Sequence, residues 1–132
     1  DIYKVEAPSL LYSSISDDFT LFIYSNNGRN RIGLVTAITN AKTLSTAIEG
    51  WEGSMIQDTD NLFKLLGRKT QTQTNGIKFT SGSGTGGETY RFAEFSPISD
   101  NFSIAYATYK DKYFIFTTSK DSLAKIFEQL PK

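Results

Sequence analysis

Cysteine and histidine are both absent from the 132 residues of this chain. Without cysteine there is no disulfide, no thiolate metal ligand and no thiol nucleophile. Without histidine there is no imidazole ligand and no histidine general base. Two large groups of metal-binding and catalytic sites are therefore excluded. We expect no metal and no cofactor, and we assign no catalytic residue.

The chain also lacks a membrane span and an excess of positive charge. No apolar run approaches the roughly 18 residues that cross a bilayer, and no signal peptide is recognisable. Fourteen basic residues balance fourteen acidic residues, whereas a nucleic-acid-binding protein normally carries a basic face. We therefore expect no nucleic-acid partner. Because the chain begins at Asp1 and not at Met, we expect an upstream segment, including any membrane anchor, to be missing.

One long helical pattern lies in the middle of the chain, from Asn40 to Gly67. Apolar residues recur there at spacings of three and four, which places them on one helix face: Leu44, Ala47, Ile48, Trp51 and Met55. Asn40 is a suitable N-cap. Gly50 and Gly53 disfavour a continuous helix, so we expect a break near Trp51 and a second helical segment over residues 61–66.

Strand patterns flank this helix on both sides. Aromatic and β-branched residues predict strands over 19–25, 31–39, 88–95, 102–109 and 112–118. The loop 26–30 and the pair Lys110-Asp111 would close two hairpins. Ser119 would cap a final helix with an apolar face. We expect residues 1–16 to be an extended lead-in and residues 81–87 to be a flexible Gly/Ser loop.

The two halves of the chain share an order of elements. Residues 15–21 (Ile-Ser-Asp-Asp-Phe-Thr-Leu) match residues 98–104 (Ile-Ser-Asp-Asn-Phe-Ser-Ile), and the capped helices follow at similar offsets. This suggests a duplicated β-β-α unit. Helices that follow hairpins usually collect on one face of an antiparallel sheet. We therefore expect a single α+β domain over residues 1–132, built as a two-layer sandwich with the helices on one face.

Several residue groups are candidates for a site, and each has a structural interpretation. Five aromatic residues would form a binding surface if they share an open sheet face, and otherwise belong to the core and to cross-strand pairs: Tyr90, Phe92, Tyr106, Tyr109 and Tyr113. Trp51 with Met55 would line a ligand groove, or else pack in the core. Asp58 and Asp60 resemble the start of a calcium loop but lack its later Gly and Glu, which favours helix capping. Surface solvation or capping explains the remaining carboxylates: Asp17 with Asp18, Glu49 with Glu52, and Asp111 with Asp121.

Four stretches together resemble a known kind of domain. They are Ile-Glu-Gly-Trp-Glu-Gly-Ser-Met (48–55), Asp-Asn-Leu-Phe (60–63), Tyr-Arg (90–91), and the closing segment from Ile104 to Leu123. The chain resembles uncharacterised exported α+β domains that follow a single N-terminal membrane helix in bacteria with small genomes. The resemblance implies an extracytoplasmic or cell-surface location, and contact with the membrane only through the missing anchor.

These observations favour a binding or scaffolding module without enzymatic activity, whose partner is a protein or a surface polymer. Two alternatives stay open. One is a carboxylate-based enzyme acting on a glycan, which needs two carboxyl groups about 5 to 10 Å apart in a concave cluster. The other is a small-ligand carrier with a pocket beneath Trp51. The sequence does not indicate an oligomeric state.

Overall fold

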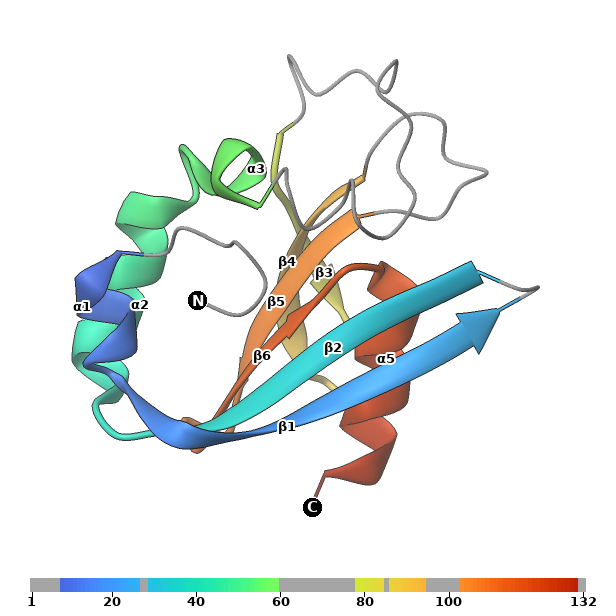
Figure 1. Ribbon diagram of the computed structural model, residues 1–132, viewed down its shortest axis with the longest axis horizontal. Coiled ribbons are helices and arrows are strands. Elements are labelled where there is room, and N and C mark those ends of the chain that lie inside the picture. Colours follow the sequence, from blue (N-terminus) through green and yellow to red (C-terminus); the bar gives the residue numbers. More distant parts are fainter. Residues whose placement is uncertain (1–7, 27–28, 60–77, 85, 95–102, 131–132) are drawn as a thin grey trace.

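A computed structural model describes residues 8–26, 29–59, 78–84, 86–94 and 103–130, which form one antiparallel sheet and four helices (Figure 1). The helices are α1 (Ser9–Tyr12), α2 (Ala41–Trp51), α3 (Met55–Asp58) and α5 (Lys120–Gln129). The strands are β1 (Ile15–Asn26), β2 (Arg29–Ile38), β3 (Thr80–Ser83), β4 (Thr89–Glu94), β5 (Ser103–Tyr109) and β6 (Tyr113–Thr117). They lie side by side in the order β1-β2-β6-β5-β4-β3. The predicted α+β class with an antiparallel sheet is confirmed.

Helix α2 begins and ends where its sequence predicts. The Asn40 side chain accepts a hydrogen bond from the Thr43 amide at 3.0 Å, so it is the N-cap. The predicted apolar face is buried. The chain turns after Trp51, and α3 follows as a separate helix, so the predicted break is confirmed. The Asp58 carboxylate fastens the turn by accepting from Trp51 Nε1 at 2.7 Å and from Ser54 Oγ at 2.9 Å. The predicted segment 61–66 lies outside the described residues.

The N-terminal lead-in differs from the prediction. Its residues 9–12 form the single helical turn α1 and not an extended segment, and β1 already begins at Ile15. Leu11 is buried in the same cluster as Leu44 of α2. The carbonyl of the fully buried Ser14 accepts hydrogen bonds from the amides of Thr39 and Asn40. Because so short a helix is held by these tertiary contacts and not by local propensity, the sequence pattern did not predict it.

The segment predicted as a flexible loop also contains a strand. Residues 81–83 belong to β3, where Gly82 lies beneath the Tyr90 ring of β4: a Cβ atom on Gly82 would lie 2.6 Å from that ring. The turn is therefore short. The Gly84 amide donates to the Glu88 carbonyl at 2.7 Å, and Gly87 has φ +88°. The glycines here serve close strand packing and one tight turn.

The β5–β6 hairpin turns at Lys110-Asp111, as predicted. Both residues have left-handed backbone angles, with φ of 53° and 54°, and the Lys112 amide donates to the Tyr109 carbonyl at 3.0 Å. Two consecutive left-handed residues match the right-handed twist of the strands that the turn joins. This conformation costs more for lysine than for glycine, and aspartate tolerates it better than most residues with a Cβ atom.

The helices lie on opposite faces of the sheet, so their predicted placement on one face is wrong (Figure 1). Residues alternate between two cores along the central strands: Ile104 and Tyr106 pack in the cluster of α2, whereas Ala105, Ala107 and Tyr109 pack in the cluster of α5. Successive side chains of a strand point to opposite faces. The sheet is therefore covered on both sides, by α1, α2 and α3 on one and by α5 on the other.

This arrangement bears on the suggested duplication. The order hairpin then capped helix does occur twice, as β1-β2-α2 and β5-β6-α5. However, β2 and β6 are antiparallel neighbours with their hairpin partners on the outside, and their helices lie on opposite faces. The rotation that exchanges the two hairpins would leave the helix on the same face of the sheet, whereas α5 lies on the opposite face from α2. The two units therefore have opposite hand, and no rotation superposes them. A duplicated unit would have kept its hand, so the shared order does not indicate common ancestry.

Candidate functional site

An open groove lies between α2 and the β3–β5 side of the sheet, with a cavity volume of about 540 Å³. We call it the α2 groove. Helix α2 and its C-terminal cap, Glu52, form one wall, and strands β3, β4 and β5 with the β5–β6 turn form the other. Its polar lining side chains include Ser45, Glu49, Glu52, Ser81, Arg91 and Asp111. Such a volume is typical of ligand sites in proteins.

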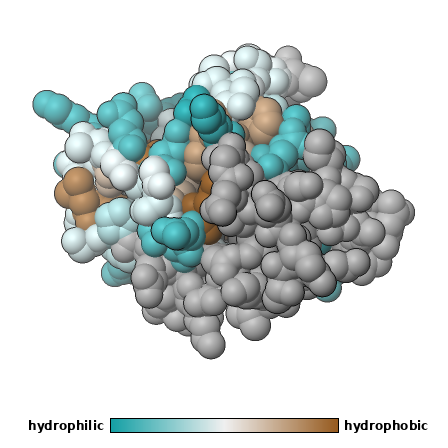
Figure 2. Space-filling model, turned by 90° about the horizontal axis from the view of Figure 1, so that it is seen from above, coloured by the Kyte–Doolittle hydropathy of each residue, from teal (hydrophilic) through white to brown (hydrophobic). Residues whose placement is uncertain are grey.

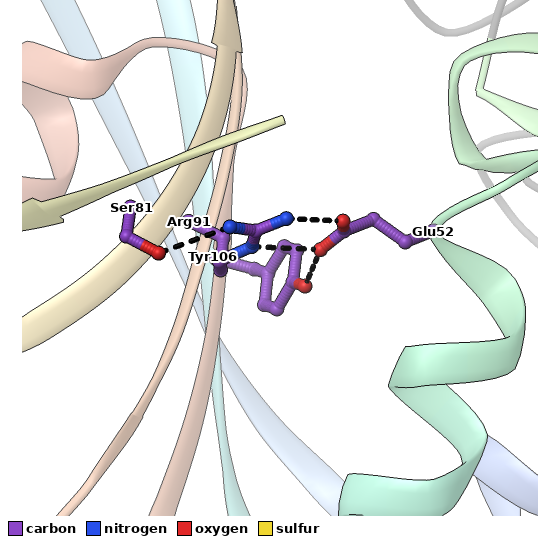
Figure 3. Close-up of polar contacts among 4 residues, drawn as sticks. All are labelled: Glu52, Ser81, Arg91 and Tyr106. Carbon is purple, nitrogen blue, oxygen red and sulfur yellow. Dashed lines mark hydrogen bonds and ion pairs between the residues drawn. The ribbon is translucent and has the colours of Figure 1, made fainter. Parts of the chain in front are cut away.

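Four residues in this groove form a hydrogen-bonded cluster, which we call the Glu52 cluster (Figure 3). Arg91 binds the Glu52 carboxylate with two nitrogens, Nη2 to Oε1 at 2.6 Å and Nε to Oε2 at 3.1 Å. Its third nitrogen, Nη1, donates to Ser81 Oγ at 3.0 Å. The Tyr106 hydroxyl donates to Glu52 Oε2. A bidentate pair with further hydrogen bonds fixes both the position and the orientation of the guanidinium group.

Strand register brings the cluster together. Ser81 of β3 pairs with Arg91 of β4, and Arg91 pairs with Tyr106 of β5, so the three lie in one row across the sheet. Paired residues in neighbouring strands project from the same face. Glu52 reaches this row from the C-terminal end of α2, where its amide donates to the Ile48 carbonyl. The cluster thus connects α2 to the edge of the sheet.

The cluster shifts the pKa values of its members. The hydrogen bond from Arg91 lowers the pKa of Glu52, and the bond from Tyr106 lowers it further against the opposing effect of burial. Burial is the main cause of the raised pKa of Tyr106, and the bond to Glu52 adds to it. The pKa of Arg91 is raised by its bond to Glu52. At neutral pH the carboxylate is therefore ionised, the phenol protonated and the guanidinium charged.

The five aromatic residues predicted as a surface do not share one face. Tyr90, Phe92, Tyr109 and Tyr113 lie in the core cluster of α5, whereas Tyr106 faces α2 in the Glu52 cluster. The rings of Tyr90 and Tyr109 lie 6.4 and 5.9 Å from that of Phe127 on α5. The structure therefore brings four of them together beneath a helix, and the fifth contributes its hydroxyl to the groove.

Trp51 and Met55 are core residues, as their structural interpretation predicted. Trp51 is 3% exposed and stacks on Phe116 with ring centroids 6.3 Å apart, and Met55 is fully buried. Asp58 accepts from Trp51 and Ser54, which explains its place in the sequence without a metal ion, and Asp60 lies outside the described residues. Across the described ranges, no group of three His, Cys, Asp or Glu side chains is arranged to hold a metal.

The three carboxylate pairs named from the sequence lie in different parts of the structure. Glu49 and Glu52 both line the α2 groove, and Asp111 joins them from the β5–β6 turn. Asp121 lies apart from Asp111, in the first turn of α5. Asp17 and Asp18 are exposed on β1. Arg91 was not predicted as a site residue, because the strand register that brings it to Glu52 cannot be read from local sequence.

No protein family, curated protein sequence or solved structure matches this chain significantly. Within the described part of the chain, none of the helices has the length and apolar character needed to cross a bilayer. Seen from above, the described surface is mostly polar, with a hydrophobic patch at the side where α1 and α2 lie (Figure 2). The resemblance to exported domains stays a prediction.

The Glu52 cluster predicts a specific acid dependence of stability. At neutral pH, Glu52→Gln should lower the free energy of unfolding by about 1 kcal/mol, since Arg91 is partly exposed and the pair is screened by solvent. Because the folded-state pKa of Glu52 is lowered, its stabilisation is present above the unfolded pKa of about 4.3 and is lost as pH falls through the folded value. The difference between wild type and variant should therefore close in acid.

Urea unfolding of both proteins over a range of pH measures this difference. Glu49→Gln is the matched control, because Glu49 lines the same groove one helical turn earlier and is exposed. We expect that control to change stability by less than about 0.5 kcal/mol at any pH. A gap between wild type and Glu52→Gln that stays constant into strong acid would show that the ion pair is not its cause.

Proposed function

We propose that this domain is a non-enzymatic binding module and that the α2 groove binds a hydroxyl-rich surface polymer, such as a polysaccharide. What carries the proposal is the groove itself: an open cavity of about 540 Å³ with a preorganised hydrogen-bonding wall. Rigid polar groups in a concave surface reduce the entropy that must be lost when a ligand binds. The proposal rests on this geometry and on no relative of known function.

The lining of the groove suits a ligand with many hydroxyl groups. Ser45, Ser81 and Thr108 offer hydroxyls that both donate and accept, and Glu49 and Asp111 offer carboxylates that accept. Ala41 and Ile48 of α2 add apolar side chains to the same lining. Apolar contacts beside hydrogen-bonding groups match a sugar ring, which carries C–H surface and hydroxyls together.

The protonation state of the Glu52 cluster favours binding over catalysis. A glycan-cleaving enzyme needs a general acid, whose pKa is raised so that it carries a proton at neutral pH. Glu52 has a lowered pKa, and both of its oxygens accept hydrogen bonds from Arg91 or Tyr106. It is therefore unsuited to donate a proton, and we assign it a structural role in the wall of the groove.

Among the residues that line the groove, Asp111 stands out by its backbone conformation. It holds a left-handed backbone conformation, with φ of 54°, that glycine would adopt without strain. Strained residues of this kind cluster at binding and active sites. Its neighbour Lys110 has the same conformation, with φ of 53°, but does not line the groove.

These two neighbours provide a matched test. Lys110→Gly and Asp111→Gly should each raise the free energy of unfolding by up to about 1 kcal/mol, because each removes a Cβ atom from a left-handed backbone position. On an array of immobilised polysaccharides, we expect the wild type and Lys110→Gly to bind the same members. Asp111→Gly should bind them about tenfold or more weakly, because it loses a charged acceptor.

Two outcomes would contradict the proposal. One is that the wild type binds no polysaccharide on the array. The other is that Asp111→Gly binds as tightly as Lys110→Gly, which would remove the α2 groove as the binding site. Thermal unfolding of both variants verifies that they are folded when binding is measured.

The proposal includes an extracytoplasmic location, which is supported by the resemblance of the sequence to exported domains. Protease treatment of intact cells that express the full-length gene tests it, with an antibody to this domain as the readout. Digestion before lysis is the expected result. Protection until lysis would contradict the location and would favour an intracellular partner for the groove.

A further inference from the structure

Strand β1 forms one edge of the sheet, and among the described residues no strand pairs with its outer side (Figure 1). It is the longest strand, with 12 residues, and its only irregularity lies between Ile15 and Phe19. From Phe19 to Asn26 its sequence contains no charge, proline or glycine. Proteins normally protect exposed edges with such residues, because an open edge is a template for another strand.

The opposite edge of the sheet shows what protection looks like. Strand β3 has four residues, of the sequence Thr-Ser-Gly-Ser, and carries no large apolar side chain. By contrast, β1 exposes Phe19 at 48% and Ile23 at 68%. These two residues are four positions apart and therefore lie on the same face of the strand. Of the two edge strands, β1 alone therefore combines a long uncharged run with exposed apolar side chains.

We propose that β1 pairs antiparallel with β1 of a second copy of this chain, about a two-fold axis at Leu21. The proposal is independent of the function assigned to the α2 groove. With Leu21 opposite Leu21 of the second copy, Phe19 lies opposite Ile23 of the second copy, and the reverse contact follows by symmetry. Directly opposed residues of an antiparallel pair share a face and have Cβ atoms about 5 Å apart. Phe19 of each copy would therefore cover Ile23 of the other, so that the dimer contains this contact twice.

Self-complementarity supports a second copy over an unrelated strand. A two-fold axis at Leu21 places an exposed Phe19 opposite an exposed Ile23 on both sides of the axis, whereas an unrelated strand would need matching apolar residues of its own. The chain has no net charge to oppose association with a second copy.

The size of this contact indicates its strength. With the axis at Leu21, residues 19–23 of the two uncharged runs face each other, so this part of the paired edges spans about 17 Å at about 3.4 Å per residue. A single strip of this length is at the lower end of specific interfaces, below the roughly 800 Å² per partner of standard ones. We therefore expect a reversible dimer with a dissociation constant in the micromolar range.

The first test compares two equivalent surface substitutions by sedimentation velocity over a wide concentration range. Ile23→Lys places a charge on the exposed edge and should weaken dimerisation at least tenfold. Leu10→Lys makes the same kind of change at an exposed residue of α1, which is 42% exposed, and should leave the dimer unchanged. A wild type that stays monomeric throughout, or a dimer that tolerates Ile23→Lys, would overturn the proposal. Monomers in which the β1 amides that point away from β2 are also protected from hydrogen exchange would overturn it too, and would point to another segment of the same chain as the occupant.

The second test uses the absence of cysteine, because an introduced thiol can then cross-link only to its own counterpart. Leu21→Cys should form a disulfide-linked dimer under mild oxidation, since the two Cβ atoms would lie about 5 Å apart. Ile23→Cys should not, because the two residues 23 would be about 13 Å apart along the strands. Efficient cross-linking at residue 23 but not at residue 21 would overturn the proposed axis.

Discussion

Replacing Trp51 with alanine should lower the free energy of unfolding by about 3–5 kcal/mol. The indole is 3% exposed and stacks on Phe116 of β6 with an interplanar angle of 22°. It therefore connects α2 to the middle of the sheet. Truncation would leave a cavity between helix and sheet and would also leave the Asp58 carboxylate without its indole donor. Both effects act in the same direction.

Urea unfolding followed by far-ultraviolet circular dichroism measures this loss, since Trp51 is the only tryptophan and its fluorescence disappears with it. Trp51→Phe keeps most of the apolar contact but removes the indole N–H, so we expect it to cost clearly less than Trp51→Ala. Tyr12→Ala is the control, because Tyr12 is 51% exposed, and should change stability by less than about 0.5 kcal/mol. A loss below about 1 kcal/mol for Trp51→Ala would mean that the indole is not a core residue.

The elements that the sequence predicted correctly are those governed by local chemistry. The cap of α2 at Asn40 and the cap of α5 at Ser119 each accept a hydrogen bond from an amide in the first helical turn. The Lys110-Asp111 turn and the break after Trp51 also lie where the sequence places them. In each case the deciding interaction joins residues within a few positions of one another.

One prediction that failed, with all helices on one face, concerned a long-range choice. A signal for the correct answer was present in the central strands. β5 (Ser-Ile-Ala-Tyr-Ala-Thr-Tyr) and β6 (Tyr-Phe-Ile-Phe-Thr) are apolar on almost every position and not on alternate ones. A strand that is apolar on both faces is typical of a sheet that is covered on both sides. A two-layer sheet with one open face does not account for that pattern.

The candidate site was predictable only in part, for a related reason. Glu49 and Glu52 stood out as carboxylates on one helix, but their partners lie on three strands. Ser81, Arg91 and Tyr106 meet in one row because of the register of β3, β4 and β5. A shift of one residue would turn Arg91 to the face of α5. Register depends on the packing of both faces, which a reading of local patterns does not include.

The position of α5 leads to the second large effect, at Gly33 of β2. A Cβ atom on Gly33 would lie 2.6 Å from Ile126 Cδ1 of α5 and 3.2 Å from Thr117 Cγ2 of β6. Gly33→Ala should therefore lower the free energy of unfolding by about 1–3 kcal/mol through overpacking. Gly50→Ala is the matched control, because no atom lies within 4 Å of that Cβ in the exposed face of α2. We expect it to stabilise the protein by up to about 1 kcal/mol.

A second substitution identifies the cause of the Gly33 effect. Ile126→Val removes the clashing Cδ1 atom and alone should cost about 0.5–1.5 kcal/mol, since Ile126 is fully buried. In the double variant the new methyl group occupies the space that Cδ1 leaves, so the loss should be smaller than the sum of the two single losses by about 1 kcal/mol. Such coupling requires that α5 lie directly on β2, on the face away from α2. Additive losses would contradict this contact and, with it, the placement of the two helices on opposite faces of the sheet.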